Sequence, residues 1–349
     1  MTGVMIGVDP HKASHTAVAA GADEQPLGQL RVRASAAQAR RLLEWAAPWP
    51  ERSWAVEGAG GLGHLLARQL VAAGERVLDV QPKLAARVRL LAGEAVNKND
   101  PNDARSIAVT ALRSRNVREV TADDHRAVLK MWSRRVHDLA RNRTRVACRL
   151  HAALCELVPG GIGKEIAIAH AERVLAQAAP SGAVQRARAE LAADLLDDLR
   201  RADDQLRETK KRLAAAVQAT GTSLTEIFGV GPFVAATVIG EAGDVSRFAS
   251  RDAFAAYNGT APIEVSSRRR KVFRLSRRGN RRINHAAHMT AVTQVRYPNT
   301  EGRAYFDKKI AEGKTTKEAL RALKRQVSDA FYKHLKADAA RASGSAEGP

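Results

Sequence analysis

Two long stretches in the middle of the chain place apolar residues at alternating intervals of three and four positions. The first covers residues 129–157, with Arg143 as a polar break, and the second covers residues 192–213. This spacing puts the apolar side chains on one stripe of an α-helix. Each stripe needs an apolar partner. The two helices therefore pack either against each other, as a hairpin, or against another copy of the chain.

The segment before these helices has the pattern of an α/β domain. Short apolar runs occur at residues 4–8, 16–20, 29–33, 54–56 and 76–80, and helical patterns at 36–47, 62–73 and 102–113. Strands that alternate with helices predict a sheet with parallel pairs. Three successive strands before the first helix predict that this sheet begins with antiparallel pairs.

The segment after the long helices is mainly helical. Residues 224–236 are expected to form a helix, a Gly-Val-Gly turn and a second helix, and Thr315 to Ala337 an amphipathic helix that starts with a Thr315–Glu318 capping box. A loop is expected from Pro159 to Gly182, and a disordered tail over residues 338–349. We therefore expect domains at residues 1–124, 125–217 and 218–337, followed by the tail.

The charge of the chain is unevenly distributed. Lys and Arg number 57 against 37 Asp and Glu in 349 residues, a net charge of +20. Residues 1–124 hold 16 basic and 14 acidic residues, whereas residues 216–349 hold 23 and 12. A clustered excess of this size predicts a polyanionic partner. No apolar run approaches the ~18 residues of a membrane span, and the two cysteines fit a reducing cytoplasm.

Four carboxylates occupy positions that suit a metal site. Asp9 and Glu57 each follow a short apolar strand, and Asp100 and Asp103 lie three residues apart, on one face of a helical turn. Carboxylate oxygens are the ligands that Mg²⁺ or Mn²⁺ prefer. A simpler explanation is also open, in which Asp100 and Asp103 favour a helix N-terminus and Asp9 is a turn residue.

A basic stretch near the C-terminal end is the strongest candidate for nucleic-acid binding. Residues 266–282 contain nine basic residues and no acidic one: Arg268, Arg269, Arg270, Lys271, Arg274, Arg277, Arg278, Arg281 and Arg282. Interleaved apolar residues favour a packed element over a solvated loop, the alternative. Gly229 and Gly231 would expose backbone N–H groups to phosphate at a helix N-terminus, unless they form only a tight turn.

Ser266 and Ser267 stand where this basic stretch begins. A hydroxyl beside several arginines is well placed to attack a phosphodiester, because guanidinium groups bind the phosphate and its developing charge. Serine pairs are common in loops, so composition alone does not assign a nucleophile.

Several motifs resemble those of the DEDD-type insertion-sequence transposases, which are related to Piv-type DNA invertases and include bridge-RNA-guided recombinases. The run from Ile6 to Lys12 resembles the opening strand of that family, Glu57 its second acid, and Asn97 to Ala104 its third and fourth acids. The C-terminal resemblance is carried by Gly229–Pro232, Gly243–Ser250, Ala256–Pro262 and Leu275–Asn280. The chain departs from the family pattern at two points. The family often has Thr or Ser before the glycine that follows the second acid, where this chain has Glu57-Gly58-Ala59-Gly60, and its serine is usually followed by Gly, where this chain has Arg268.

The resemblance implies a fold and a set of catalytic residues. It implies an α/β RNase H-like (RuvC-like) domain at residues 1–124 and a mainly helical C-terminal transposase domain with a helix-hairpin-helix-like element. It also implies Asp9, Glu57, Asp100 and Asp103 as Mg²⁺ ligands. The nucleophile of the family lies five residues beyond the proline of its Ala-Tyr-x-Gly-x-x-Pro motif, which favours Ser267 over Ser266.

The implied activity is cutting and rejoining of target and donor DNA through a phosphoserine intermediate. The implied partners are a structured bridge RNA and further copies of the chain, as a dimer or tetramer, in the cytoplasm at the nucleoid. One rival is a metal-dependent, structure-specific nuclease that uses water as its nucleophile. The other is a DNA-binding protein without catalysis, which the presence of all four acids disfavours.

Overall fold

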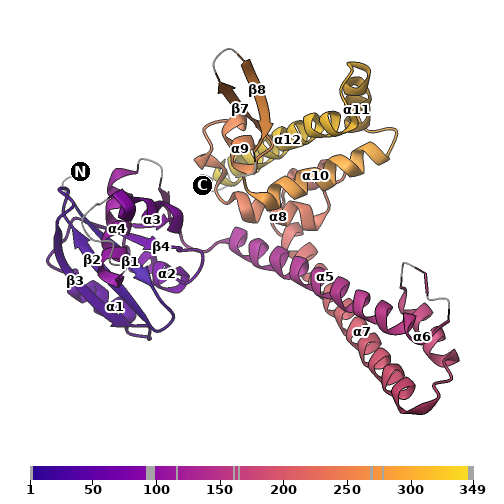
Figure 1. Ribbon diagram of the computed structural model, residues 1–349. Helices are drawn as coiled ribbons and strands as arrows, with labels where there is room; N and C mark the ends of the chain where they lie inside the picture. The colour runs from indigo at the N-terminus through magenta and orange to yellow at the C-terminus, as the bar shows by residue number, and fades with distance from the viewer. Residues whose placement is uncertain are drawn as a thin grey trace. The chain divides into compact units, whose positions relative to one another are not determined.

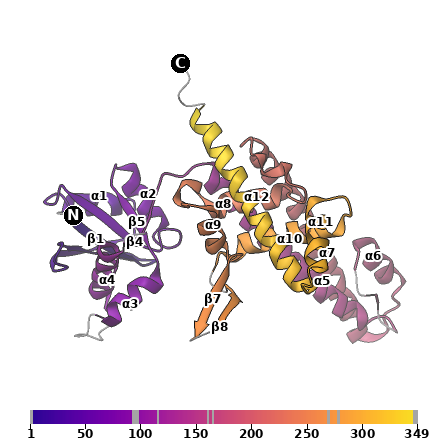
Figure 2. The ribbon, with the colours of Figure 1, turned by 90° about the horizontal axis from the view of Figure 1, so that it is seen from above.

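The computed structural model describes residues 3–91, 99–114, 117–159, 162–163, 166–267, 270–276 and 279–344, drawn as ribbons in Figures 1 and 2. The chain divides into two compact units, Met1–Asp123 and Asp124–Pro349. Each unit has hydrophobic clusters of its own. In the described part of the chain, no helix combines the length and apolar character that crossing a membrane requires.

The first unit is built on a mixed sheet. Its strands are β1 (Val4–Pro10), β2 (Ser14–Ala20), β3 (Pro26–Arg33), β4 (Arg52–Glu57), β5 (Val77–Val80) and β6 (Arg118–Glu119), in the order β3-β2-β1-β4-β5-β6. The pairs β1–β2 and β2–β3 are antiparallel, and β1–β4 and β4–β5 are parallel. This order is that of an RNase H-like fold, so the predicted fold class and the antiparallel start are confirmed.

Helices cover both faces of this sheet. On one face, α1 (Gln38–Trp45) and α2 (His64–Ala72) pack on alternate strand residues that include Ile6, Val8 and Trp54. On the other face, α4 (Asp100–Arg113) and α3 (Pro82–Leu91) pack on the residues between them, such as Met5 and Ala55. Alternation along a strand separates these two sets. It also assigns each residue at the carboxyl end of β1 and β4 to one face.

The two long stretches form an antiparallel helical pair in the second unit. α5 (His125–Cys155) lies along α7 (Gly182–Gln218) (Figure 1), and the apolar stripes of both are buried. At the polar break, the Arg143 guanidinium pairs with the Asp203 carboxylate of α7. Both stripes therefore pack within one chain. Of the two arrangements that the sequence leaves open, the structure has the hairpin.

The expected loop at residues 159–182 contains a helix, α6 (Ile168–Gln177). Ala171 of this helix is buried, and Val174 and Leu175 pack against the cluster formed by the adjoining ends of α5 and α7. The expectation of a plain loop was wrong because the pairing of α5 with α7 leaves apolar surface at their ends. The short helix covers that surface.

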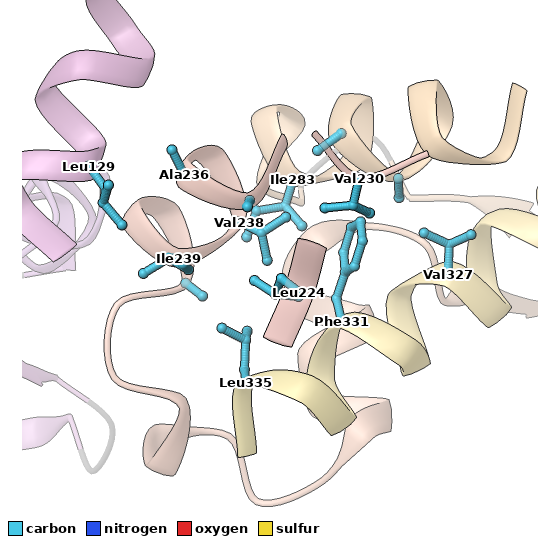
Figure 3. Close-up of a cluster of buried hydrophobic side chains, with 14 of the residues drawn as sticks. Leu129, Leu224, Val230, Ala236, Val238, Ile239, Ile283, Val327, Phe331 and Leu335 are labelled. Atoms are coloured by element: carbon cyan, nitrogen blue, oxygen red, sulfur yellow. The ribbon is translucent and has the colours of Figure 1, made fainter. Parts of the chain in front are cut away.

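The rest of the second unit surrounds one hydrophobic core. Its elements are η1 (Ser223–Glu226), α8 (Pro232–Ala242), η2 (Val245–Arg247), α9 (Arg251–Asn258), β7 (Pro262–Ser267), β8 (Arg270–Leu275), α10 (Arg281–Arg296), α11 (Glu301–Ala311) and α12 (Thr316–Gly344). Figure 3 shows Leu129 of α5, Val238 of α8, Ile283 of α10 and Phe331 of α12 in this core. The Thr315–Glu318 capping box is present at the start of α12.

Two expectations for this region need correction, and both involve Asp338. The element before Gly229 is the 3₁₀ turn η1 rather than a full helix. The expected tail is helical as far as Gly344. The Asp338 carboxylate accepts hydrogen bonds from the Thr222 and Ser223 hydroxyl groups, at 2.6 and 2.7 Å. These bonds hold the last turns of α12 against η1, and the alanine-rich sequence that follows has high helix propensity.

Candidate functional site

The carboxyl ends of β1 and β4 bring two of the predicted acids to one edge of the sheet. The strands are parallel with Val8 opposite Val56, so Asp9 and Glu57 occupy the next positions on neighbouring strands. Asp9 shares its face with Met5 and Gly7, and Glu57 shares its face with Ala55. Both acids therefore lie on the face that α4 covers.

The close approach of α4 to this face depends on Gly7. A Cβ atom at Gly7 would lie 2.0 Å from the Ala104 carbonyl oxygen, so only glycine allows the helix to pack at this depth. The Asn99 side chain caps α4 by accepting a hydrogen bond from the Asn102 amide at 2.9 Å. As a result, Asp100 and Asp103 occupy the first turn of α4, close to the end of β1.

A histidine links two of these carboxylates. His11 Nε2 lies 3.0 Å from Asp9 Oδ2 and 3.6 Å from Asp100 Oδ1. Potential ligand atoms of Asp9, His11 and Asp100 all lie within 4.8 Å of one another. Arg31 Nη2 of β3 lies 3.6 Å from Asp100 Oδ2. His11 and Arg31 were not among the predicted site residues, although His11 stands only two positions after Asp9.

The environment of Asp9 is unfavourable for its negative charge. Burial raises the pKa of the Asp9 carboxyl, His11 lowers it, and the carboxylates of Asp103 and Asp100 raise it further. A bound cation would offset both the burial and the repulsion between like charges. The set of carboxylate oxygens beside one imidazole therefore fits a divalent metal ion.

The predicted serine pair lies in the second unit, on a hairpin that projects from its helices (Figure 1). β7 and β8 are antiparallel, with Ser267 opposite Arg270 and Ser266 opposite Lys271. Arg274 lies farther along β8, opposite Ile263. Arg268, Arg269, Arg277 and Arg278 lie outside the described residues. The predicted nucleophile is thus at the end of β7 farthest from the helices.

Two glycines and an asparagine fix the base of this hairpin. Gly259 ends α9 in the left-handed region, with φ of 73°, and a Cβ at Gly279 would lie 2.3 Å from the Gly259 nitrogen. The backbone N–H of Asn280 donates to the Tyr257 carbonyl oxygen at 2.6 Å. These contacts join the Ala256–Pro262 and Leu275–Asn280 motifs. They explain why each motif needs a glycine at that point.

Replacing Gly279 with Ala should destabilise the chain by about 1–3 kcal/mol, because the added methyl group forces two backbone segments apart. The shift in the urea or thermal unfolding midpoint of the full chain measures this effect. Gly163→Ala is a matched control, since a Cβ there meets nothing within 4 Å. Equal stability of the two variants would contradict the proposed close packing.

A buried carboxylate connects the hairpin base to the long helices. Glu241 of α8 pairs with Arg134 of α5 at 3.1 Å and lies 3.6 Å from Arg282 Nε of α10. The Asn280 amide group donates to Glu241 Oε2 at 3.2 Å, and its Oδ1 accepts from the backbone at the start of α10. Burial opposes the ionised form, but the Asn280 hydrogen bond and the Lys130 and Arg134 charges hold the pKa of Glu241 below its usual value.

The predicted phosphate-binding residues divide into two groups. The Arg282 guanidinium already lies near Glu241, whereas Arg281 is exposed and donates to the Ser276 carbonyl oxygen at 3.5 Å. Gly229 packs against Thr290 and Thr293 of α10, with φ of 85°. Gly231, the N-cap of α8, is exposed and faces open space. Arg281 and Gly231 are thus the more accessible members.

Comparisons with known proteins point to one family. Residues 6–159 match a transposase model of the DEDD IS110 type, and residues 221–307 match the model described as "Transposase IS116/IS110/IS902 family". The chain is 25% identical to the "Insertion element IS116 uncharacterized 44.8 kDa protein" of Streptomyces clavuligerus, over 95% of this chain and 94% of that protein. It is 27% identical to the IS900 "uncharacterized 42 kDa protein" of Mycobacterium paratuberculosis, over 95% and 96%.

The chain is also similar to solved structures of one protein. That protein is Thermus thermophilus RuvC, in one case "in complex with Holliday junction substrate". That alignment has 18% identity and a TM-score of 0.28, and it covers 34% of this chain and 99% of the RuvC chain.

Proposed function

The chain belongs to the DEDD-type IS110/IS116/IS902 family of insertion-sequence transposases, which cut and rejoin DNA, and we propose that it does so with a carboxylate-held metal and a serine nucleophile. The observation that carries the proposal is the gathering of Asp9, Asp100 and His11 at the carboxyl edge of the sheet. Glu57 follows on the neighbouring strand, and Asp103 is close enough to raise the pKa of Asp9.

We assign Asp9, Glu57, Asp100 and Asp103 as the ligands of Mg²⁺, with Mn²⁺ as a substitute. A divalent ion held there would withdraw charge from the scissile phosphate and favour ionisation of the attacking hydroxyl. The carboxylates would set its position, because β4 pairs with β1 beside Gly7 and α4 packs closely against Gly7. His11, which bonds to Asp9, orients that carboxylate.

Ser267 is assigned as the nucleophile, at the end of β7. Its hydroxyl oxygen attacks phosphorus and gives up its proton, and a bridging P–O bond breaks so that the departing strand end leaves with a proton as a hydroxyl. A strand hydroxyl then attacks the phosphoserine, releases the serine and restores a phosphodiester. The ester conserves the energy of the broken bond, so strand exchange needs no nucleotide cofactor.

The nucleic-acid contacts are assigned to the basic stretch and the start of α8. The arginines and the lysine of residues 268–282 would bind phosphates in duplex DNA or in a structured bridge RNA. The net excess of 11 positive charges over residues 216–349 supports this assignment. A dimer or tetramer would let the carboxylates of one copy act with the serine of another. The cytoplasmic, nucleoid-associated location remains a prediction.

Incubation of the protein with duplex DNA containing the element ends and Mg²⁺ tests the proposal. The expected product is a strand that migrates slowly on a denaturing gel until protease releases it. EDTA should abolish this product. Reactions with and without RNA transcribed from the element test whether a bridge RNA guides the reaction. Cleaved strands that never carry protein would contradict the serine mechanism and support the water-using nuclease.

A further inference from the structure

A second cluster of basic residues lies where α10 packs against α12. Arg281, His285 and His288 follow one another at intervals of four and three along α10, which places them on one face of that helix. Arg321 and Lys324 lie three residues apart on α12. The two helices lie side by side in both ribbon views and share the hydrophobic core (Figures 1 and 2). We call these five residues the α10–α12 cluster.

The central ammonium group of this cluster is held in place. Lys324 is half-buried, and its Nζ donates to Asn284 Oδ1 at 2.8 Å. Asn284 is only 7% exposed, and its own amide group donates to the Asn258 carbonyl oxygen at 3.0 Å. The partner of the lysine is therefore a neutral, fixed amide, which orients the ammonium group without neutralising it.

The charges around Lys324 are of the same sign. Burial and the guanidinium groups of Arg281 and Arg321 lower the pKa of Lys324. Burial, Lys324 and His285 likewise lower the pKa of His288. Mutual repulsion of this kind is relieved by a bound anion. The cluster is thus electrostatically incomplete in the free protein.

Neighbouring arginines with a structural role are paired. Arg325, the next residue on α12, pairs with Asp329 at 2.7 Å and with Asp252 of α9. Arg303 of α11 pairs with Asp307. Within the described residues, no ion pair is formed by Arg281, Arg321 or Lys324. The fold therefore leaves their charges available to a ligand.

We propose that the α10–α12 cluster binds the phosphodiester backbone of duplex DNA. The inference rests on the proposed function, because α10 begins a few residues after the hairpin that carries Ser267. At about 1.5 Å per residue, Arg281 to His288 spans about 10 Å. That length is the rise of about three base pairs at 3.4 Å per step. The cluster continues the basic stretch onto two packed helices and adds His285, His288, Arg321 and Lys324 to the contact surface.

The double variant Arg321→Gln with Lys324→Gln tests this surface. Glutamine removes the charge at position 324 and keeps a polar N–H donor there. Anisotropy of a fluorescein-labelled duplex of mixed sequence, titrated with the full chain in EDTA at several salt concentrations, gives log K against log salt. The slope should become shallower by about 0.9 for each phosphate that the variant no longer neutralises.

The control is Arg207→Gln with Lys210→Gln, which removes two exposed charges at the same spacing from α7. It should leave the slope within error of the unmodified chain, and unchanged thermal unfolding of both variants establishes that they are folded. A slope that is the same in both variants would overturn the proposal. So would a flattened slope for a structured RNA but not for duplex DNA. The binding assay requires no cleavage. A failure of the serine mechanism would therefore appear as a missing covalent adduct and would leave the salt slope unchanged.

Discussion

Asp9→Asn should abolish DNA strand cleavage while making the metal-free protein more stable at neutral pH. Removal of an outer partner of a metal ligand typically costs about 10–100-fold in affinity or activity. Loss of the ligand itself should therefore reduce cleavage by at least about 100-fold. Asparagine keeps the shape of the side chain, and its Oδ1 can still accept a hydrogen bond from His11. The decrease would thus report on charge rather than on packing.

The stability effect follows from the raised pKa of Asp9. Burial and the carboxylates of Asp103 and Asp100 raise this pKa above its unfolded value, so the folded chain binds the proton more tightly. The ionised side chain then destabilises the fold, and stability decreases as pH rises through this pKa. Asp9→Asn removes that penalty. Its advantage in thermal unfolding should be largest at neutral pH and vanish below the ordinary pKa of an aspartate.

A metal titration makes the same test without activity. Mg²⁺ should raise the unfolding temperature of the unmodified chain, because it binds the folded state only, and should do so much less for Asp9→Asn. Asp23→Asn is the control in the same unit, since Asp23 is exposed and accepts a hydrogen bond from the Gln25 amide. Equal Mg²⁺ stabilisation of both variants, together with normal cleavage by Asp9→Asn, would exclude the proposed site.

The carboxylates could be predicted because each is marked by local sequence. Asp9 and Glu57 follow apolar strands, and Asp100 and Asp103 open a helix, so strand and helix patterns place these four acids in the chain. Their role as metal ligands is implied by the family resemblance and stays a prediction. His11 and Arg31 were missed because their role depends on distances across the fold: Arg31 reaches Asp100 from β3, which lies two strands away from β1 in the sheet. No periodicity in the sequence records that contact.

The same distinction applies to the second unit. The stripes of α5 and α7 could be predicted from spacing, but the sequence does not state which partner each stripe takes. In the structure the two stripes pack within one chain, where Arg143 pairs with Asp203, 60 residues away in the sequence. The helical end of the chain was missed for a similar reason, because the bonds of Asp338 to Thr222 and Ser223 cross more than 100 residues.

Ser267→Ala should eliminate the covalent protein–DNA adduct completely, whereas Ser266→Ala should retain it. The two serines occupy successive positions of β7, opposite Arg270 and Lys271. Since successive strand positions alternate between two faces, we expect only one of the pair to reach a phosphate. The substitutions are equally small and lie at the same end of the hairpin, so each is the matched control for the other.

The adduct is the decisive product because it separates the serine mechanism from every mechanism that uses water. A hydroxyl is a weak nucleophile at neutral pH and needs activation. The carboxylate site should therefore be needed as well, and Asp9→Asn should lose the adduct even with Ser267 intact. Mass spectrometry of the protease-treated product should place the nucleotide on Ser267. A nucleotide on Ser266, or an adduct that persists in Ser267→Ala, would overturn the assignment. A Ser267→Ala variant that still binds DNA with the unmodified salt dependence would show that only the chemistry was removed.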